Sequence, residues 1–497
     1  MHSFRGLTPP QEVLDAVQRG EIASFCLFGY NVESPAQVRA MCEQIRNAAQ
    51  RGGQPVPLIG IDQEGGQLMA VSSGVSDLPG NMALGATRDP ELAYLVGMVL
   101  AKELRAIGIN LNFAPSVDVN TNFENPGMGV RSFGDDPRLV ADLGAALVRG
   151  MQDQGVIATA KHFPGMGASA GDTHHTSTTV DKSIEQLEAQ DLLPFRAVIK
   201  AGVGAIMSSH VIMPQLDPDN PATLSHAVMT ELLRGRLDYS GLLITDAMDM
   251  YAVSQFGALA STQRALAAGI DLVLLGHLED KFSLMRALAG TETEEARKRI
   301  RNAQRFADTR LLPFDTLNNE EHRAIGQRVA EHAITVVKGA DHLPLHPQET
   351  DVIAVITPEP VNVTPADTTD RIQIGLAGSV SRRHRATISY ELPARATPND
   401  IAAILEGVSS ATIVIEGTSN AYQDVAQATL VRELIARGKQ PVVVAMRMPH
   451  DLQAFPNVEV YVCTYSLRPV ALEAAARVLF GEIAARGRLP VALPLTQ

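Results

Sequence analysis

The chain has 497 residues, of which 45% are hydrophobic and 20% are charged. This length exceeds what one hydrophobic core usually holds, and the composition is that of a globular protein, which excludes the disordered and fibrous classes. Its 42 basic and 55 acidic residues give a net charge of −13, which argues against nucleic acids and anionic membrane surfaces as partners.

The N-terminal segment, MHSFRGLTPPQEVLDAVQRG, contains no apolar run long enough for a signal peptide. No run of about 18 apolar residues follows it. Three cysteines lie far apart in the sequence, at positions 26, 42 and 463, a spacing that indicates buried free thiols rather than disulfides. We therefore expect a soluble, cytoplasmic protein that acts on a small molecule.

Short apolar runs alternate with amphipathic helical patterns over roughly the first 280 residues. The alternation predicts parallel strands joined by helices. The expected helices lie at 36–50, 90–107, 137–154, 183–201 and 227–236, and the expected strands at 24–30, 57–62, 110–119, 157–163, 205–211, 242–248 and 271–276.

Six of these seven strands end in residues with chemically useful side chains. Convergence of many strand ends on one place is typical of a closed barrel, whereas an open sheet uses mainly its switch point. We therefore predict a (β/α)8-type TIM barrel, with the eighth strand either in the short N-terminal stretch or missing. The strand-end residues are Asp62, Asp118, Asn120, Lys161, His162, His210, Asp246 and His277.

The remainder of the chain predicts a connector and a second domain. Residues 292–313 and 319–336 have helical patterns with no strand between them. A further β-α series begins at 352 and closes with a helix after 469. The expected domains are thus a barrel at 1–290, a helical connector at 291–345, and a smaller α/β sandwich domain at 346–497.

Three residues of the barrel stand out individually. Asp246 follows three apolar residues and a threonine, so its carboxylate emerges from a buried strand, where it is either functional or the N-cap of a helix. Asp62 also leaves a strand and precedes a Gly-Gly turn. Arg131 lies in a long loop of irregular composition, a kind of segment that is often functional.

The segment KHFPGMGASAGDTHHTSTTV, residues 161–180, begins at a strand end and continues as a glycine-rich arm. Asp172 and His174 are two residues apart, so a turn can bring the carboxylate to the imidazole and raise its pKa, as a proton-transfer pair requires. A zinc site is the alternative, but glycine-rich loops support metal ligands poorly. We expect no metal and assign His175 to the solvated loop surface.

Taken together, these motifs resemble glycoside hydrolase family three, in particular its β-N-acetylglucosaminidase branch. The resemblance covers nearly the whole chain and includes IGIDQEGGQ, NPGMGVRSFGDDP, ATAKHFPGMG, DTHHT and ITDAMDM. It implies exo-acting, retaining removal of β-linked N-acetylglucosamine from small saccharides or muropeptide fragments, without a cofactor. It also implies Asp246 as nucleophile, Asp172 and His174 as the acid/base pair, and Asp62, Arg131, Lys161 and His162 as sugar-binding residues.

Some features depart from this resemblance or leave alternatives open. Met166 and Gln67 replace a histidine and an arginine common in the family, and the first barrel strand is missing or curtailed. A histidine acid/base is neutral as a base and does not repel an anionic acceptor, so phosphate could replace water and make the protein a phosphorylase. A catalytically silent sugar-binding homologue is the second alternative. The basic run SRRHR at 381–385 is either an anion site or a solvated loop.

Overall fold

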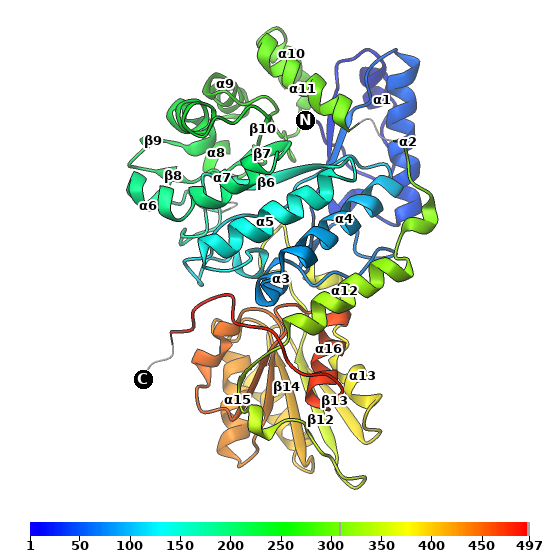
Figure 1. The fold of residues 1–497 in the computed structure, drawn as a ribbon, viewed down its shortest axis with the longest axis vertical. Helices are drawn as coiled ribbons and strands as arrows, with labels where there is room; N and C mark the ends of the chain where they lie inside the picture. Colours follow the sequence, from blue (N-terminus) through cyan, green and yellow to red (C-terminus); the bar gives the residue numbers. More distant parts are fainter. Residues whose placement is uncertain (174, 308–309, 495–497) are drawn as a thin grey trace.

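The computed structural model describes residues 1–173, 175–307 and 310–494. The chain forms two α/β bodies stacked along the long axis of the molecule, the first coloured blue to green and the second yellow to red (Figure 1). Position 174, which carries the predicted acid/base histidine, lies outside the described residues. Within the described part of the chain, every helix is too short or too polar to cross a membrane.

The first body is built on six parallel strands, each buried along its whole length, as in parallel sheets covered on both faces. Two further segments extend its edges: His2 bridges to Phe25, and Leu272 bridges to Ile244, both in parallel. These segments also meet, because the Leu275 N–H donates to the Met1 carbonyl at 3.2 Å. The strand order is β1 (Ser24–Leu27), β2 (Leu58–Ile61), β5 (Leu111–Asn112), β6 (Ile157–Phe163), β7 (Ala205–Ser208) and β10 (Leu242–Thr245).

The helices around this sheet begin where the sequence provides starting signals. In three of them, a residue with a capping side chain is followed by proline. Proline has no backbone N–H, and this costs nothing in the first turn because an N–H there would have no partner within the helix. Ser34, Asp89 and Asp136 each accept a hydrogen bond from a backbone N–H of the first turn. The helices on this body are α1 (Gln11–Gln18), α2 (Pro35–Arg51), α3 (Asn81–Thr87), α4 (Pro90–Ala106), α5 (Pro137–Gln152), α6 (Ile184–Ala189), α7 (Leu192–Lys200), the π-helical η4 (Ala227–Arg236), α8 (Tyr251–Ser254), α9 (Ala258–Ala268) and α10 (Lys281–Leu288).

The predicted helix at 183–201 is divided in the structure into α6 and α7. The break falls at Gln190 and Asp191. The buried carboxylate of Asp191 pairs with Lys182 at 2.6 Å, which fixes the chain at this point. Pro194 lies in the first turn of α7, where a missing N–H costs nothing.

Two helices connect the bodies, α11 (Glu294–Phe306) and α12 (Glu320–Ala333). The second lies between them and packs against α3 and α4 of the first body and α16 (Pro469–Leu479) of the second (Figure 1). The imidazole of His322 on α12 is fully buried and meets Glu103 of α4, with 2.9 Å between Nδ1 and Oε1. The connector is therefore packed between the two bodies along α12.

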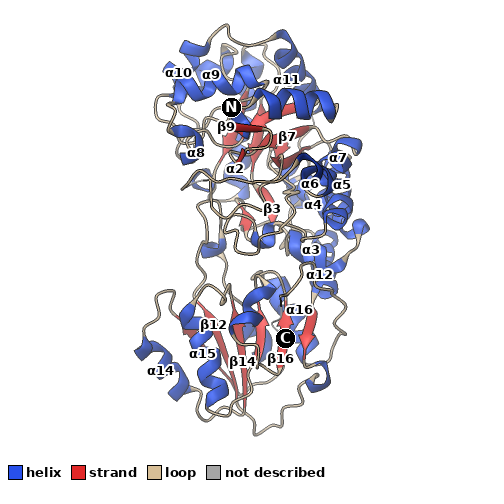
Figure 2. Ribbon diagram, turned by 90° about the vertical axis from the view of Figure 1, so that its left-hand side faces the viewer, coloured by secondary structure: helices blue, strands red, loops and turns tan. Residues whose placement is uncertain are grey.

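The second body contains a six-stranded sheet in the order β11-β16-β15-β14-β12-β13, with only β11 antiparallel. Figure 2 shows its strands in red, with β12, β14 and β16 labelled. Strand β11 lies within the segment that we predicted as the connector, and in chain order it is the first strand of this sheet. The sequence pattern did not predict this strand because it has only four residues and follows helix α12 directly. The strands are β11 (Thr335–Lys338), β12 (Ile353–Pro358), β13 (Thr387–Leu392), β14 (Ile413–Thr418), β15 (Val442–Ala445) and β16 (Val460–Cys463).

Helices cover both faces of this second sheet. Side chains alternate along β12: Ile353 and Val355 pack with α13 (Leu376–Ser381) and α16, whereas Ala354 and Ile356 pack with α14 (Pro398–Gly407) and α15 (Val425–Ala436). The chain crosses from β13 over β12 to β14, which makes the gap between β12 and β14 a topological switch point. The carboxyl end of β12 faces the first body.

Candidate active site

The carboxyl ends of the first sheet open into a cavity of about 560 Å³. Asp62 follows β2, Lys161 and His162 lie near the end of β6, and Asp246 follows β10. Arg131 reaches the same cavity from the turn η2 (Gly129–Arg131). The structure thus brings together five of the seven residues for which we predicted a role.

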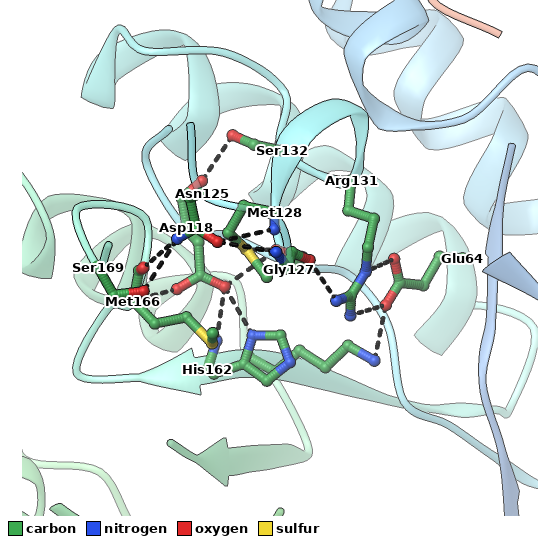
Figure 3. Close-up of polar contacts among 12 residues, drawn as sticks. Glu64, Asp118, Asn125, Gly127, Met128, Arg131, Ser132, His162, Met166 and Ser169 are labelled. Atoms are coloured by element: carbon green, nitrogen blue, oxygen red, sulfur yellow. Dashed lines mark hydrogen bonds and ion pairs between the residues drawn. The ribbon is translucent and has the colours of Figure 1, made fainter. Parts of the chain in front are cut away.

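A buried network of charges forms one wall of this cavity. The Lys161 Nζ atom lies 2.6 Å from Asp62 Oδ1 and 2.7 Å from Glu64 Oε1. Arg131 holds both oxygens of Glu64, with Nε–Oε2 at 3.0 Å and Nη2–Oε1 at 2.7 Å (Figure 3). Glu64 and Lys161 are 3% and 2% exposed, so each charge depends on its partners for solvation.

The partners set the protonation states of this network. Burial opposes ionisation of Glu64, but Arg131 and Lys161 outweigh it and lower the pKa of the carboxyl to about 2. Burial likewise opposes the charge on Lys161, while Asp62 and Glu64 together raise its pKa. The network therefore presents fixed charges to the cavity at neutral pH. Because Asp62 is 31% exposed at its side chain, its carboxylate can also reach a ligand.

His162 is oriented by a carboxylate that lies behind it. Its Nδ1 atom is 2.7 Å from Asp118 Oδ2, and its backbone N–H donates to the same oxygen (Figure 3). Burial opposes ionisation of Asp118, but His162 and the N–H of Met166 outweigh it and lower the pKa of this carboxyl. A neutral His162 donates from Nδ1 here, which leaves Nε2 as its acceptor.

Asp246 is half-buried at the end of β10. One carboxylate oxygen accepts a hydrogen bond from the N–H of Ala247 at 2.8 Å, and the carbonyl of Ala247 in turn accepts one from His210 Nε2 at 3.0 Å. The next helix, α8, starts at Tyr251 with Met250 as its N-cap. The interpretation of Asp246 as a helix cap is therefore wrong, and its carboxylate lines the cavity instead.

The loop after β6 is attached to the first body near its start. Asn125 donates to the carbonyl of Met166 and to the hydroxyl of Ser169 at 2.8 and 3.0 Å (Figure 3). Further along, Asp172 is buried, and its carbonyl accepts the N–H of His175. His175, to which we assigned no role, lines the cavity. The pairing of Asp172 with the residue at 174 stays a prediction.

The basic run at 381–385 is engaged in ion pairs within the second body. Arg383 contacts Glu473 and Glu482 at 2.7 and 2.6 Å, and Arg382 contacts Glu473 at 2.5 Å. Its two leading arginines are thus held by carboxylates, which argues against the anion site we considered for this run. The loop 362–371 of the same body lines the cavity instead.

Comparisons with known proteins agree with this architecture. The model of the glycosyl hydrolase family 3 N-terminal domain matches residues 3–307, and the chain belongs to this family. Beta-hexosaminidase A of Pseudoalteromonas piscicida is 30% identical over 97% of this chain and 91% of its own length.

Two further relatives differ in how much of the chain they match. The beta-hexosaminidase of Xylella fastidiosa (strain M23) is 38% identical over 59% of this chain and 87% of its own. The family 3 β-N-acetylglucosaminidase of Paenibacillus sp. str. FPU-7 superimposes with a TM-score of 0.93 and 35% identity, covering 100% of this chain and 97% of that one. The two-body arrangement is thus shared with a solved member of the family.

Proposed function

We propose that this glycoside hydrolase is an exo-β-N-acetylglucosaminidase that acts on small saccharides or muropeptide fragments. The observation that carries the proposal is the cavity itself, where Asp246 is placed with the charged groups of Asp62, Lys161 and Arg131. A nucleophilic carboxylate beside fixed hydrogen-bonding charges is what retaining glycoside hydrolysis requires. The relatives named as hexosaminidases support the choice of sugar.

The proposed reaction has two steps. Asp246 attacks the anomeric carbon and forms a covalent glycosyl ester, while His174 gives its proton to the departing glycosidic oxygen. His174 then removes a proton from water, and the resulting hydroxide displaces Asp246 and releases the sugar with its original configuration. Asp172 holds the imidazole in place for both transfers.

The remaining predicted residues bind the terminal sugar. Asp62 and Lys161 offer an acceptor and a donor to its hydroxyl groups, and Arg131 adds a second cationic donor. His162 contributes the ring nitrogen that is not used by Asp118. Since Glu64 holds both cations at fixed positions, the sugar meets a preorganised set of charges rather than flexible side chains.

We infer that the first body is an eight-stranded (β/α) barrel. The six named strands would be completed by residues 1–3 and 272–275, which bridge to the two edges and bond to each other. The short N-terminal segment then supplies the strand missing from the sequence pattern. In such barrels catalytic groups lie at the carboxyl ends of the strands, as the cavity residues do here.

The decisive experiment traps the covalent intermediate. A 5-fluoro glycosyl fluoride of N-acetylglucosamine should label the peptide that contains Asp246, and Asp246→Ala should lose both the label and hydrolysis of an aryl β-N-acetylglucosaminide. For His174→Ala, the loss of rate should be greatest with poor leaving groups. Labelling elsewhere, or full activity of Asp246→Ala, would contradict the assignment. Product analysis in phosphate buffer separates hydrolysis, which gives free sugar, from phosphorolysis.

A further inference from the structure

The second body supplies the outer wall of the cavity. Strand β12 ends at Pro358. The loop that follows extends to the first body, where seven of its residues line the cavity without contributing to the charged network described above. These residues are Asn362, Pro365, Ala366, Asp367, Thr368, Asp370 and Arg371.

This loop is fastened at Gln67 to the turn that follows Asp62. Thr368 donates from its N–H and its hydroxyl to the carbonyl of Gln67, at 2.9 and 2.8 Å. The N–H of Met69 donates back to the Thr368 hydroxyl at 3.1 Å. Arg447, also from the second body, binds Asp367 at 2.9 Å and the Gln67 side chain. All of these groups are buried, so the loop has a fixed position relative to Asp62.

At the exposed end of this loop, Arg371 reaches across to the first body. Its Nη1 atom lies 3.4 Å from the carbonyl of Ala70. Its Nη2 atom lies close to Gly29: a Cβ atom added to Gly29 would be only 2.6 Å from this nitrogen. The absence of a side chain at Gly29 therefore leaves room for the guanidinium at the rim of the cavity.

Gly29 also lies between two residues of an aromatic wall. Phe28 and Tyr30 have ring centroids 5.4 Å apart, and the His277 ring is 4.5 Å from that of Phe28. All three line the cavity. The guanidinium of Arg371 and this aromatic wall thus meet at Gly29, within the lining of the cavity.

Arg371 differs from the other cations of the cavity in its charge balance. Lys161 and Arg131 are each neutralised by buried carboxylates. In contrast, the described residues place no carboxylate oxygen within 4.0 Å of the Arg371 guanidinium, although Asp370 is its neighbour in the chain. Most of its five N–H donors remain available to a ligand that enters the cavity.

We propose that Arg371 and the aromatic wall form the binding site for the leaving portion of the substrate, and that Arg371 selects a sugar carrying a carboxylate. This proposal rests on the proposed glycosidase function and specifies its substrate class. An aromatic wall suits the apolar face of a sugar ring, and a guanidinium suits the planar carboxylate, to which it can donate two parallel hydrogen bonds.

The test uses two disaccharides that differ by one carboxylate. N,N′-diacetylchitobiose is neutral, whereas N-acetylglucosaminyl-β-1,4-N-acetylmuramic acid carries a lactyl carboxylate on the leaving sugar. We measure kcat/KM for both and take the ratio of acidic to neutral substrate. Arg371→Met should lower this ratio by about 10- to 100-fold, the range expected for one charge-assisted interaction. Arg371→Lys should recover part of the loss because it keeps the charge.

Arg385→Met is the matched control. Arg385 is also an exposed arginine of the second body, but it precedes β13 and therefore lies at the opposite end of the sheet. Its replacement should leave the ratio unchanged. An equal loss for both disaccharides in Arg371→Met would mean a structural role and would overturn the proposal.

Two other results are possible, and each can be told apart from the loss of preference for the acidic disaccharide that we expect in Arg371→Met. If added phosphate gives a sugar 1-phosphate from chitobiose, and Arg371→Met abolishes that product while the ratio stays constant, then Arg371 binds phosphate and the proposal is wrong. If the wild-type protein cleaves neither disaccharide nor an aryl β-N-acetylglucosaminide, the proposed function itself fails, whatever the role of Arg371.

Discussion

Replacing Glu64 by glutamine removes the negative charge that holds Lys161 and Arg131 in the cavity wall, with almost no change in shape. The pKa of Glu64 falls from its ordinary value of 4.5 to about 2 on folding. At about 1.36 kcal/mol for each tenfold change in proton affinity, this corresponds to about 3 kcal/mol of stability. Removing one partner of a buried ion pair typically costs 3–5 kcal/mol, so both routes give a loss of about 3 kcal/mol at pH 7.

The pH dependence makes the reasoning testable. Because folding lowers this pKa, the contribution of Glu64 is fully present above about pH 4.5 and is lost as the pH falls toward 2. The difference in free energy of unfolding between wild type and Glu64→Gln should therefore shrink over this interval. Since the chain contains no tryptophan, urea unfolding is best followed by far-ultraviolet circular dichroism.

A surface pair provides the control for this measurement. Glu43 contacts Arg39 at 3.1 Å with its side chain 46% exposed, and exposed pairs of this kind contribute about 0–1 kcal/mol. Glu43→Gln should therefore leave unfolding nearly unchanged at every pH. If Glu64→Gln were as stable as wild type at pH 7, or equally destabilised at pH 7 and pH 2, the charge-based account would be refuted.

Two further predictions concern groups that act behind the cavity. Asp118→Asn removes the negative charge behind His162, and we expect about a 10- to 100-fold loss of kcat/KM with an aryl glycoside; unchanged kinetics would show that this carboxylate does not orient the ring. Arg447→Met leaves the carboxylate of Asp367 buried and unpaired, which should destabilise the protein by about 3–5 kcal/mol. Thermal unfolding should show this loss, and adding Asp367→Asn should restore part of it; a double variant no more stable than Arg447→Met would contradict the pairing.

The sequence predicted the convergence of strand ends well, because it follows from simple rules. Asp62, Lys161 and Asp246 each come directly after, or at the end of, a short apolar run, and parallel strands joined by helices carry their carboxyl ends to one side. The α/β class and the gathering of these residues in one cavity could thus be read from the chain. The roles assigned to them stay predictions.

Other parts of the site gave no usable signal. Glu64 looks like a solvated turn residue in DQEGGQ, and only the positions of its two cationic partners show that it is buried. Arg371 is separated from Gly29 by more than 300 residues, and no periodicity connects such distant positions. The N-terminal segment near His2 is too short for a strand pattern and is defined only by its bridge to Phe25.

The support of the Gly66–Gln67 turn by the second body also sets an order of events during synthesis. The carbonyls of Gly66 and Gln67 receive their partners from Arg468 and Thr368, whereas the family domain ends at residue 307. At about 5–20 residues per second, the ribosome needs roughly 8–30 s to proceed from 307 to 468. During that interval the first body can already have formed, but its substrate site still lacks these partners. Activity should therefore emerge only after the last strand of the second sheet has been made.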